Sequence, residues 1–173
     1  YHSDSETVYM LSGNYRQNFF KYDVGSATWS SLPEIPSYAE YGASLEVVGD
    51  YIYATRGAGS TAFYRFSIEE NSWEVPQRGF FGPSTNAGSN YFDYQRGTEM
   101  EEDGSGNIYI MRGDYSDEFG VYRIESGEFS KLANLPVGAY NGAAMVYNED
   151  EGVIYVTNGA IRTDRAGTTH NYF

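Results

Sequence analysis

The stretch TVYMLSG, residues 7–13, decides the fold, because the chain repeats its pattern three more times. The later copies are YIYATRG (51–57), NIYIMRG (107–113) and VIYVTNG (153–159). Each copy is a short apolar run that contains a Tyr, and a Gly follows four residues after that Tyr. Successive Tyr residues are 44, 56 and 46 residues apart. A spacing of about 40 to 50 residues indicates a stacked or radial repeat architecture.

The flanks of the motif repeat as well. An aromatic segment follows each of the first three Gly residues, then a single aromatic, then Leu-Pro or Val-Pro, and then a Gly-led segment beginning at Tyr41, Arg96 or Asn141. Gly, Asn, Asp and Pro separate these short segments at intervals of roughly 8 to 12 residues, which is typical of all-β proteins. No window keeps a 3.6-residue periodicity over a helical length. The sequence therefore predicts an all-β fold.

This order of segments resembles the kelch repeat over nearly the whole chain. Kelch repeats usually close the second strand with two glycines, whereas here the residue before the Gly is Ser12, Arg56, Arg112 or Asn158. The resemblance implies a kelch-like β-propeller, with about three and a half four-stranded antiparallel blades in this chain. The alternative is an unrelated β-sandwich whose spacing is coincidental.

The repeats divide residues 1–173 into one propeller unit with an incomplete blade at each end. The expected segments are a partial blade (8–36), a complete blade (41–76), an insertion loop (77–95), a complete blade (96–136) and a partial blade (141–173). Open strand edges pair readily with other chains. Three arrangements would cover them: a larger propeller, two copies that complete one ring, or a compact four-bladed ring.

The insertion is rich in Gly, Ser and Asn, and it carries Phe80, Phe81 and Tyr91. Long loops on a rigid β scaffold often hold binding residues. These aromatic side chains are therefore candidates for stacking on a sugar ring or contacting a protein partner. The alternative is that they fold back on the blades as a hydrophobic plug.

A second candidate site follows from the antiparallel order of the strands. The start of the first strand and the end of the second strand of a blade lie at the same end, and the resemblance implies a ligand and peptide site there. The candidate residues at this end are Arg56, Arg96, Arg112, Asp114, Tyr140, Asn141 and Asn158. Arg56 and Arg112 are equivalent in adjacent repeats and are candidates for clamping a carboxylate or sulfate. The alternative is that each Arg pairs with an acidic neighbour.

Composition restricts the partners. The net charge of −13 argues against nucleic acid as a ligand, since phosphate binding needs clustered Lys and Arg. No apolar run reaches transmembrane length, so membrane insertion is not expected. The absence of Cys, the low Lys content and the start at Tyr1 favour a secreted or cell-surface protein. Oxygen-bearing side chains alternate over residues 103–107 like the start of a calcium loop, but a hairpin turn explains them fully, so no metal and no cofactor is expected.

The function expected from the sequence is a non-enzymatic recognition or scaffold module that binds a protein, peptide or glycan partner. Catalytic motifs are missing, and the two His residues, His2 and His170, lie near opposite ends of the chain. One alternative is a structural subunit that associates with other copies through open blade edges. A glycan-active propeller enzyme is the remaining alternative.

Overall fold

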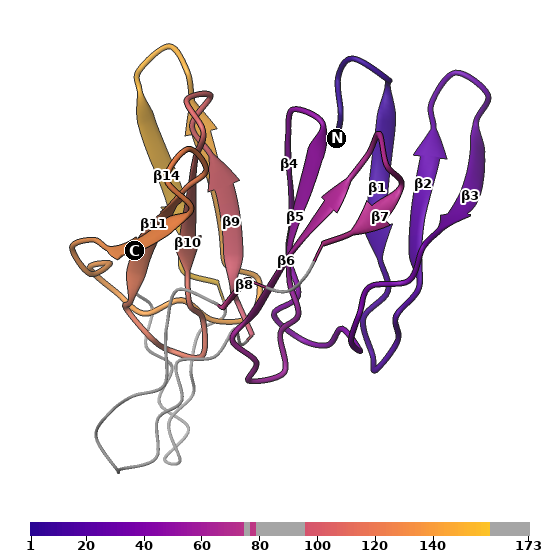
Figure 1. The fold of residues 1–173 in the computed structure, drawn as a ribbon. Coiled ribbons are helices and arrows are strands. Elements are labelled where there is room, and N and C mark those ends of the chain that lie inside the picture. Colours follow the sequence, from indigo (N-terminus) through magenta and orange to yellow (C-terminus); the bar gives the residue numbers. More distant parts are fainter. Residues whose placement is uncertain (75–76, 79–95, 160–173) are drawn as a thin grey trace.

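The computed structural model describes residues 1–74, 77–78 and 96–159, and within these residues every regular element is a strand. The strands form upright antiparallel sheets that stand side by side (Figure 1). The tight hairpin turns lie at the top of this view, and the connections between sheets lie at the bottom. The all-β fold and the arrangement of a partial kelch-like propeller are thus confirmed.

Each sheet corresponds to one blade of the predicted repeat. Blade 1 contains β1 (Thr7–Leu11), β2 (Phe19–Asp23) and β3 (Thr28–Leu32). Blade 2 contains β4 (Leu45–Val48), β5 (Tyr51–Thr55), β6 (Ala62–Ser67), β7 (Ser72–Trp73) and β8 (Gln77–Arg78). Blade 3 contains β9 (Glu99–Glu102), β10 (Asn107–Met111), β11 (Phe119–Arg123) and β12 (Glu128–Lys131). The described part of blade 4 is the pair β13 (Ala144–Asn148) and β14 (Val153–Thr157).

Two details differ from the sequence-based expectation. The Gly-led segments are not strands from their first residue, because Gly42, Gly97 and Gly142 have φ angles of 77°, 86° and 78°, outside the range of a β-strand. Strands β4, β9 and β13 therefore begin only after these glycines. The first two residues of the predicted insertion, 77–78, form β8 and pair with β6. The rest of the insertion lies outside the described residues.

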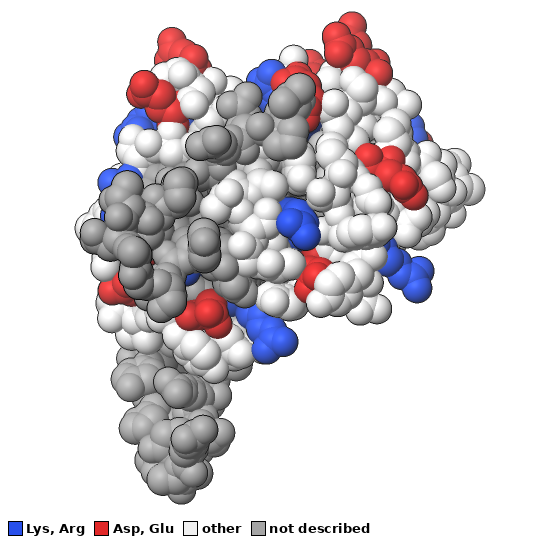
Figure 2. Space-filling view, turned by 60° about the horizontal axis from the view of Figure 1, so that its bottom comes forward, with Lys and Arg blue, Asp and Glu red and all other residues white. Residues whose placement is uncertain are grey.

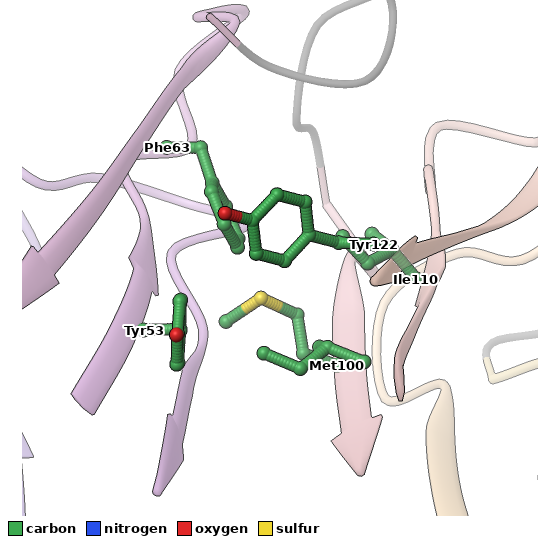
Figure 3. Close-up of a cluster of buried hydrophobic side chains, with 6 residues drawn as sticks. Tyr53, Phe63, Met100, Ile110 and Tyr122 are labelled. Carbon is green, nitrogen blue, oxygen red and sulfur yellow. The ribbon is translucent and has the colours of Figure 1, made fainter. Parts of the chain in front are cut away.

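The hydrophobic core consists of layers between neighbouring blades. The layer between blades 2 and 3 joins Tyr53 and Phe63 to Met100, Ile108, Ile110 and Tyr122. Figure 3 shows Tyr122 and Met100 reaching from blade 3 toward the rings of Tyr53 and Phe63. An equivalent layer joins Phe19 of blade 1 to Ile52 and Phe66 of blade 2. Alternate residues of each second strand face opposite neighbours, which explains why these strands are apolar on both faces.

The motif glycines allow the chain to pass close to itself at one end of each blade. A Cβ atom at Gly57, Gly113 or Gly159 would collide with the backbone that leads into the first strand of the same blade. Gly13 has no atom within 4 Å of such a Cβ. Instead, Gly13 borders a cavity of about 390 Å³ that is also lined by β1 and by residues of blades 2 and 3. Among the described residues, blade 1 has no first strand beside β1.

Candidate ligand-binding face

Backbone hydrogen bonds tie together the loops at the lower end of each blade. The N–H of Ala58 donates to the carbonyl oxygen of Tyr41 at 2.9 Å, and the N–H of Asp114 donates to that of Arg96 at 2.9 Å. In blade 4, the N–H of Tyr140 donates to the carbonyl oxygen of Asn158 at 2.9 Å. The loop after each second strand is thus tied to the segment before the first strand, as the antiparallel order predicts. We call this surface the loop face.

Three aromatic side chains and one guanidinium group lie in contact on the loop face. The Arg96 guanidinium carbon lies 4.9 Å from the centre of the Tyr41 ring, a cation–π contact. Arg96 Nη1 lies 3.4 Å from the Tyr140 hydroxyl oxygen. The rings of Tyr140 and Tyr115 are stacked, with centroids 3.9 Å apart and planes at 14°. We call these four residues the Tyr–Arg cluster.

The Tyr–Arg cluster spans three blades and remains accessible to solvent. Tyr41 precedes the first strand of blade 2, Arg96 and Tyr115 belong to blade 3, and Tyr140 precedes the first strand of blade 4. Tyr41 is 45% exposed and Tyr115 is 46% exposed, and Arg96 is exposed as well. Figure 2 shows this end of the molecule, where Lys and Arg side chains are scattered, several of them beside Asp or Glu, and do not form one basic patch.

The contact between Arg96 and Tyr140 changes the acidity of both groups. The hydrogen bond with Tyr140 raises the pKa of Arg96. Hydrogen bonds from Arg96 and, second, from Tyr115 lower the pKa of Tyr140, because a donor stabilises the phenolate form. The Tyr140 oxygen therefore serves as an acceptor for its neighbours, and the guanidinium keeps its full charge.

Backbone strain accompanies the cluster. Asp114 and Tyr115 have φ angles of 52° and 62°, and Asn14 and Tyr15 have φ angles of 60° in the equivalent loop of blade 1. A bulky residue rarely adopts this left-handed conformation, which costs of order 1 to 3 kcal/mol. Such strained conformations are concentrated at binding and active sites. The N–H of Tyr115 donates to the carbonyl oxygen of Ala139 at 2.8 Å, which fixes the strained loop against the next connection.

The other arginines of the predicted site have partners of a different kind. Arg56 Nε donates to the carbonyl oxygen of Tyr38 at 2.8 Å. Arg112 Nη1 lies 3.2 Å from Glu118 Oε2, and the two side chains are only 15% and 12% exposed. Lys131 Nζ lies 3.3 Å from the other oxygen of Glu118. Arg112 thus has the acidic partner that the alternative interpretation predicts, instead of standing with Arg56 as a clamp.

The remaining predicted residues fall into two groups. Asp114 and Asn141 are exposed on the loop face, and Asn158 is half-buried at its edge. Phe80, Phe81 and Tyr91 lie outside the described residues. Tyr115 was missed as a site residue, although a signal was present: Asn14-Tyr15 and Asp114-Tyr115 follow the motif Gly at the same distance in two repeats.

The segment that resembles a calcium loop is a hairpin turn between β9 and β10. Glu102 and Asp103 use their carboxylate oxygens to accept backbone hydrogen bonds from Gly104, Ser105, Gly106 and Asn107. Asn107 also donates its side-chain amide to Asp103 at 2.9 Å. Within the described part of the chain, no group of three His, Cys, Asp or Glu residues is placed to hold a metal ion.

Comparison with known proteins agrees with the repeat pattern. The chain is 28% identical over 117 residues to Kelch-like protein 30 of Homo sapiens, a match that covers 63% of this chain. This weak similarity supports the resemblance to the kelch family. The chain covers 18% of the length of that relative. No protein-family model matches the chain.

Proposed function

We propose that this chain is a non-enzymatic recognition module that binds a peptide segment of a protein partner on the loop face. The observation that carries the proposal is the Tyr–Arg cluster, in which solvent-accessible Tyr and Arg side chains are already held in contact before any ligand arrives. Tyr and Arg are the residue types that most often dominate binding energy at protein interfaces. The similarity to a kelch-like protein supports a role in protein binding in general.

Preorganisation is the physical advantage of this arrangement. Each rotamer-rich side chain that binding immobilises costs about 0.5 to 1.5 kcal/mol. Stacking of Tyr115 on Tyr140 and of Arg96 on Tyr41 meets part of that cost during folding. An incoming segment would contact aromatic faces for affinity and the guanidinium for orientation toward an acceptor such as a backbone carbonyl or a carboxylate.

The test is a peptide array and a glycan array probed in parallel with the wild-type chain and two variants. Arg96→Gln removes the charge from the cluster. The control, Arg123→Gln, removes an exposed charge from β11, where Arg123 Nη1 donates to the Ser130 hydroxyl oxygen at 2.8 Å. We expect wild-type chain and Arg123→Gln to bind the same peptides, and Arg96→Gln to lose them. A glycan-only profile would favour the glycan alternative, and peptide binding that Arg96→Gln leaves intact would move the site away from the cluster.

A further inference from the structure

Tyr115 and Tyr140 form a closely stacked pair of phenol rings on the loop face. Their ring centroids are 3.9 Å apart and their planes meet at 14°. In the core, Tyr53 and Tyr122 also contact each other, but their centroids are 5.9 Å apart, their planes meet at 55°, and both residues are buried. Tyr115 is 46% exposed and Tyr140 is half-buried, so a reagent in solution can reach the stacked pair.

The backbone holds both residues of this pair in place. The N–H of Tyr115 donates to the carbonyl oxygen of Ala139 at 2.8 Å, and the N–H of Tyr140 donates to that of Asn158 at 2.9 Å. A Cβ atom at Gly138 would collide with the carbonyl group of Tyr115, so the two chain segments pass as close to each other as a glycine allows. The rings are therefore held together by the fold itself.

The hydroxyl groups of the pair lie side by side. Hydrogen bonds from Arg96 and from Tyr115 reach the Tyr140 oxygen and lower the pKa of Tyr140. Since the two hydroxyls are bonded to each other and the rings are nearly parallel, the Cε carbons next to the hydroxyl group of one ring lie over those of the other. Easier loss of the phenolic proton also favours oxidation, in which a phenol gives up one electron and one proton.

We propose that Tyr115 and Tyr140 are a site of oxidative cross-linking, at which a peroxidase with hydrogen peroxide joins the two side chains as dityrosine. Each phenol loses one electron and one proton, and a new carbon–carbon bond joins a Cε of Tyr115 to a Cε of Tyr140. The hydrogen on each bonded carbon then moves to the oxygen of its own ring, which restores two phenols. The two electrons and two protons reduce one hydrogen peroxide to two waters.

The stacked geometry favours this bond over links to other tyrosines. The unpaired electron of an oxidised phenol occupies the π system, with high density on the carbons beside the oxygen, so the new bond forms through the faces of the rings. Rings that already face each other couple without diffusing together. The bond would fasten the loop after β10 to the segment before β13, and it would stabilise the fold by restricting the unfolded chain. No ligand takes part, so the test is independent of the recognition function proposed above.

The equivalent position in blade 1 provides a matched control. The N–H of Tyr15 donates to the carbonyl oxygen of Ala39 at 3.1 Å, as that of Tyr115 donates to Ala139. The residue after Ala39 is Glu40, whose carboxylate is hydrogen-bonded with the Tyr15 side chain. Tyr15 is 66% exposed, so an oxidant can reach it, but a carboxylate occupies the place of the second phenol ring.

The experiment treats a dilute solution of the 173-residue chain with a haem peroxidase and hydrogen peroxide. The monomeric fraction is isolated by size exclusion and digested with trypsin, which releases peptides 113–123 and 132–162, the carriers of Tyr115 and Tyr140. We expect these two peptides to be linked, with a mass two hydrogen atoms below their sum and with the blue fluorescence of dityrosine. Fragment-ion spectra should place the link at Tyr115 and Tyr140.

Variants and unfolding show whether the stacked pair is responsible. Tyr115→Phe and Tyr140→Phe should each abolish the linked peptides, whereas Tyr15→Phe should leave their yield unchanged. In chain unfolded by urea, the yield of this link should fall to that of other tyrosine pairs. A wild type without the link, a link between the same peptides that persists in Tyr140→Phe, or a yield that unfolding leaves unchanged would each overturn the proposal. Circular dichroism verifies that every variant is folded before oxidation.

Discussion

A Cβ atom added at Gly57 would lie 2.2 Å from the carbonyl oxygen of Tyr41. The two residues are joined by the turn in which Ala58 donates to the same carbonyl, and Gly57 has a φ angle of 72°. Gly57 is thus required for two reasons: the Tyr41 carbonyl leaves no room for a Cβ atom, and the positive φ angle disfavours other residues. This contact positions Tyr41, whose ring contacts Arg96 in the Tyr–Arg cluster.

Gly57→Ala should therefore destabilise the protein strongly. A left-handed φ alone costs an L-residue roughly 1 to 2 kcal/mol, and the collision with Tyr41 and Ala43 adds to that cost. The matched control is Gly13→Ala in the same motif, where no atom lies within 4 Å and φ is not positive. Urea unfolding should show a large loss of free energy of unfolding for Gly57→Ala and a change near zero for Gly13→Ala. Similar losses in both variants would contradict this account of the motif.

Glu46 should make the stability fall as pH rises. Burial, followed by repulsion from Glu101, raises the pKa of Glu46 to about 8, while the backbone hydrogen bond from Glu102 opposes the shift. The folded state therefore binds the Glu46 proton more tightly than the unfolded state does. The contribution of the protonated carboxyl group to the free energy of unfolding is complete below about pH 4.5 and is lost as pH rises through about 8. Glu99 on β9 is shifted in the same direction, mainly by burial.

Glu46→Gln tests this dependence, because it keeps an oxygen acceptor and removes the charge. We expect the variant to gain roughly 1 to 3 kcal/mol of unfolding free energy at pH 8.5 relative to wild type, and much less at pH 4. Glu125→Gln, at an exposed position, is the control and should change little at either pH. Denaturant unfolding at several pH values measures the effect. A gain for Glu46→Gln that is equal at both pH values would argue against a titrating carboxylate.

Phe63 should be a major source of core stability. Its ring is fully buried and contacts Tyr122 and Phe129 of blade 3 at centroid distances of 5.1 Å each. Phe63→Ala should cost about 3 to 5 kcal/mol, since it removes the transfer free energy of the ring and leaves a cavity. The comparison is Phe119→Ala, at the equivalent position of blade 3, where the side chain is only half-buried. Calorimetry should give a clearly smaller drop in Tm for Phe119→Ala, and equal drops would contradict the burial argument.

Arg112 and Arg96 should have opposite roles. Arg112→Met leaves Glu118 with Lys131 alone and should cost roughly 1 to 3 kcal/mol of unfolding free energy, because both side chains of the pair are largely buried. Arg96→Gln affects an exposed residue and should change stability by less than about 0.5 kcal/mol. Thermal and denaturant unfolding distinguish the two. A stable Arg112→Met variant would return Arg112 to the list of binding candidates.

The sequence by itself determined the fold class, the repeat and the order of the strands. Four copies of a Tyr followed by a Gly place the second strand of each blade, and Tyr9, Tyr53, Tyr109 and Tyr155 are indeed central in β1, β5, β10 and β14. Short apolar runs and the turn residues between them are local properties of the sequence, so they can be recognised without knowing what lies nearby in space. The same patterns placed the loop face, because antiparallel order fixes which loops share one end.

Only the tertiary structure decided how the residues of the loop face are used. Arg56, Arg96 and Arg112 are alike in the sequence, yet one bonds to a backbone carbonyl, one lies over the Tyr41 ring, and one is held by Glu118. The stacking of Tyr115 on Tyr140, the burial of Glu46 and the exposure of Tyr155 likewise depend on which blade packs against which. Such contacts join residues that are far apart in the chain. Their energies depend on interatomic distance and on burial, and neither quantity can be derived from a short stretch of sequence.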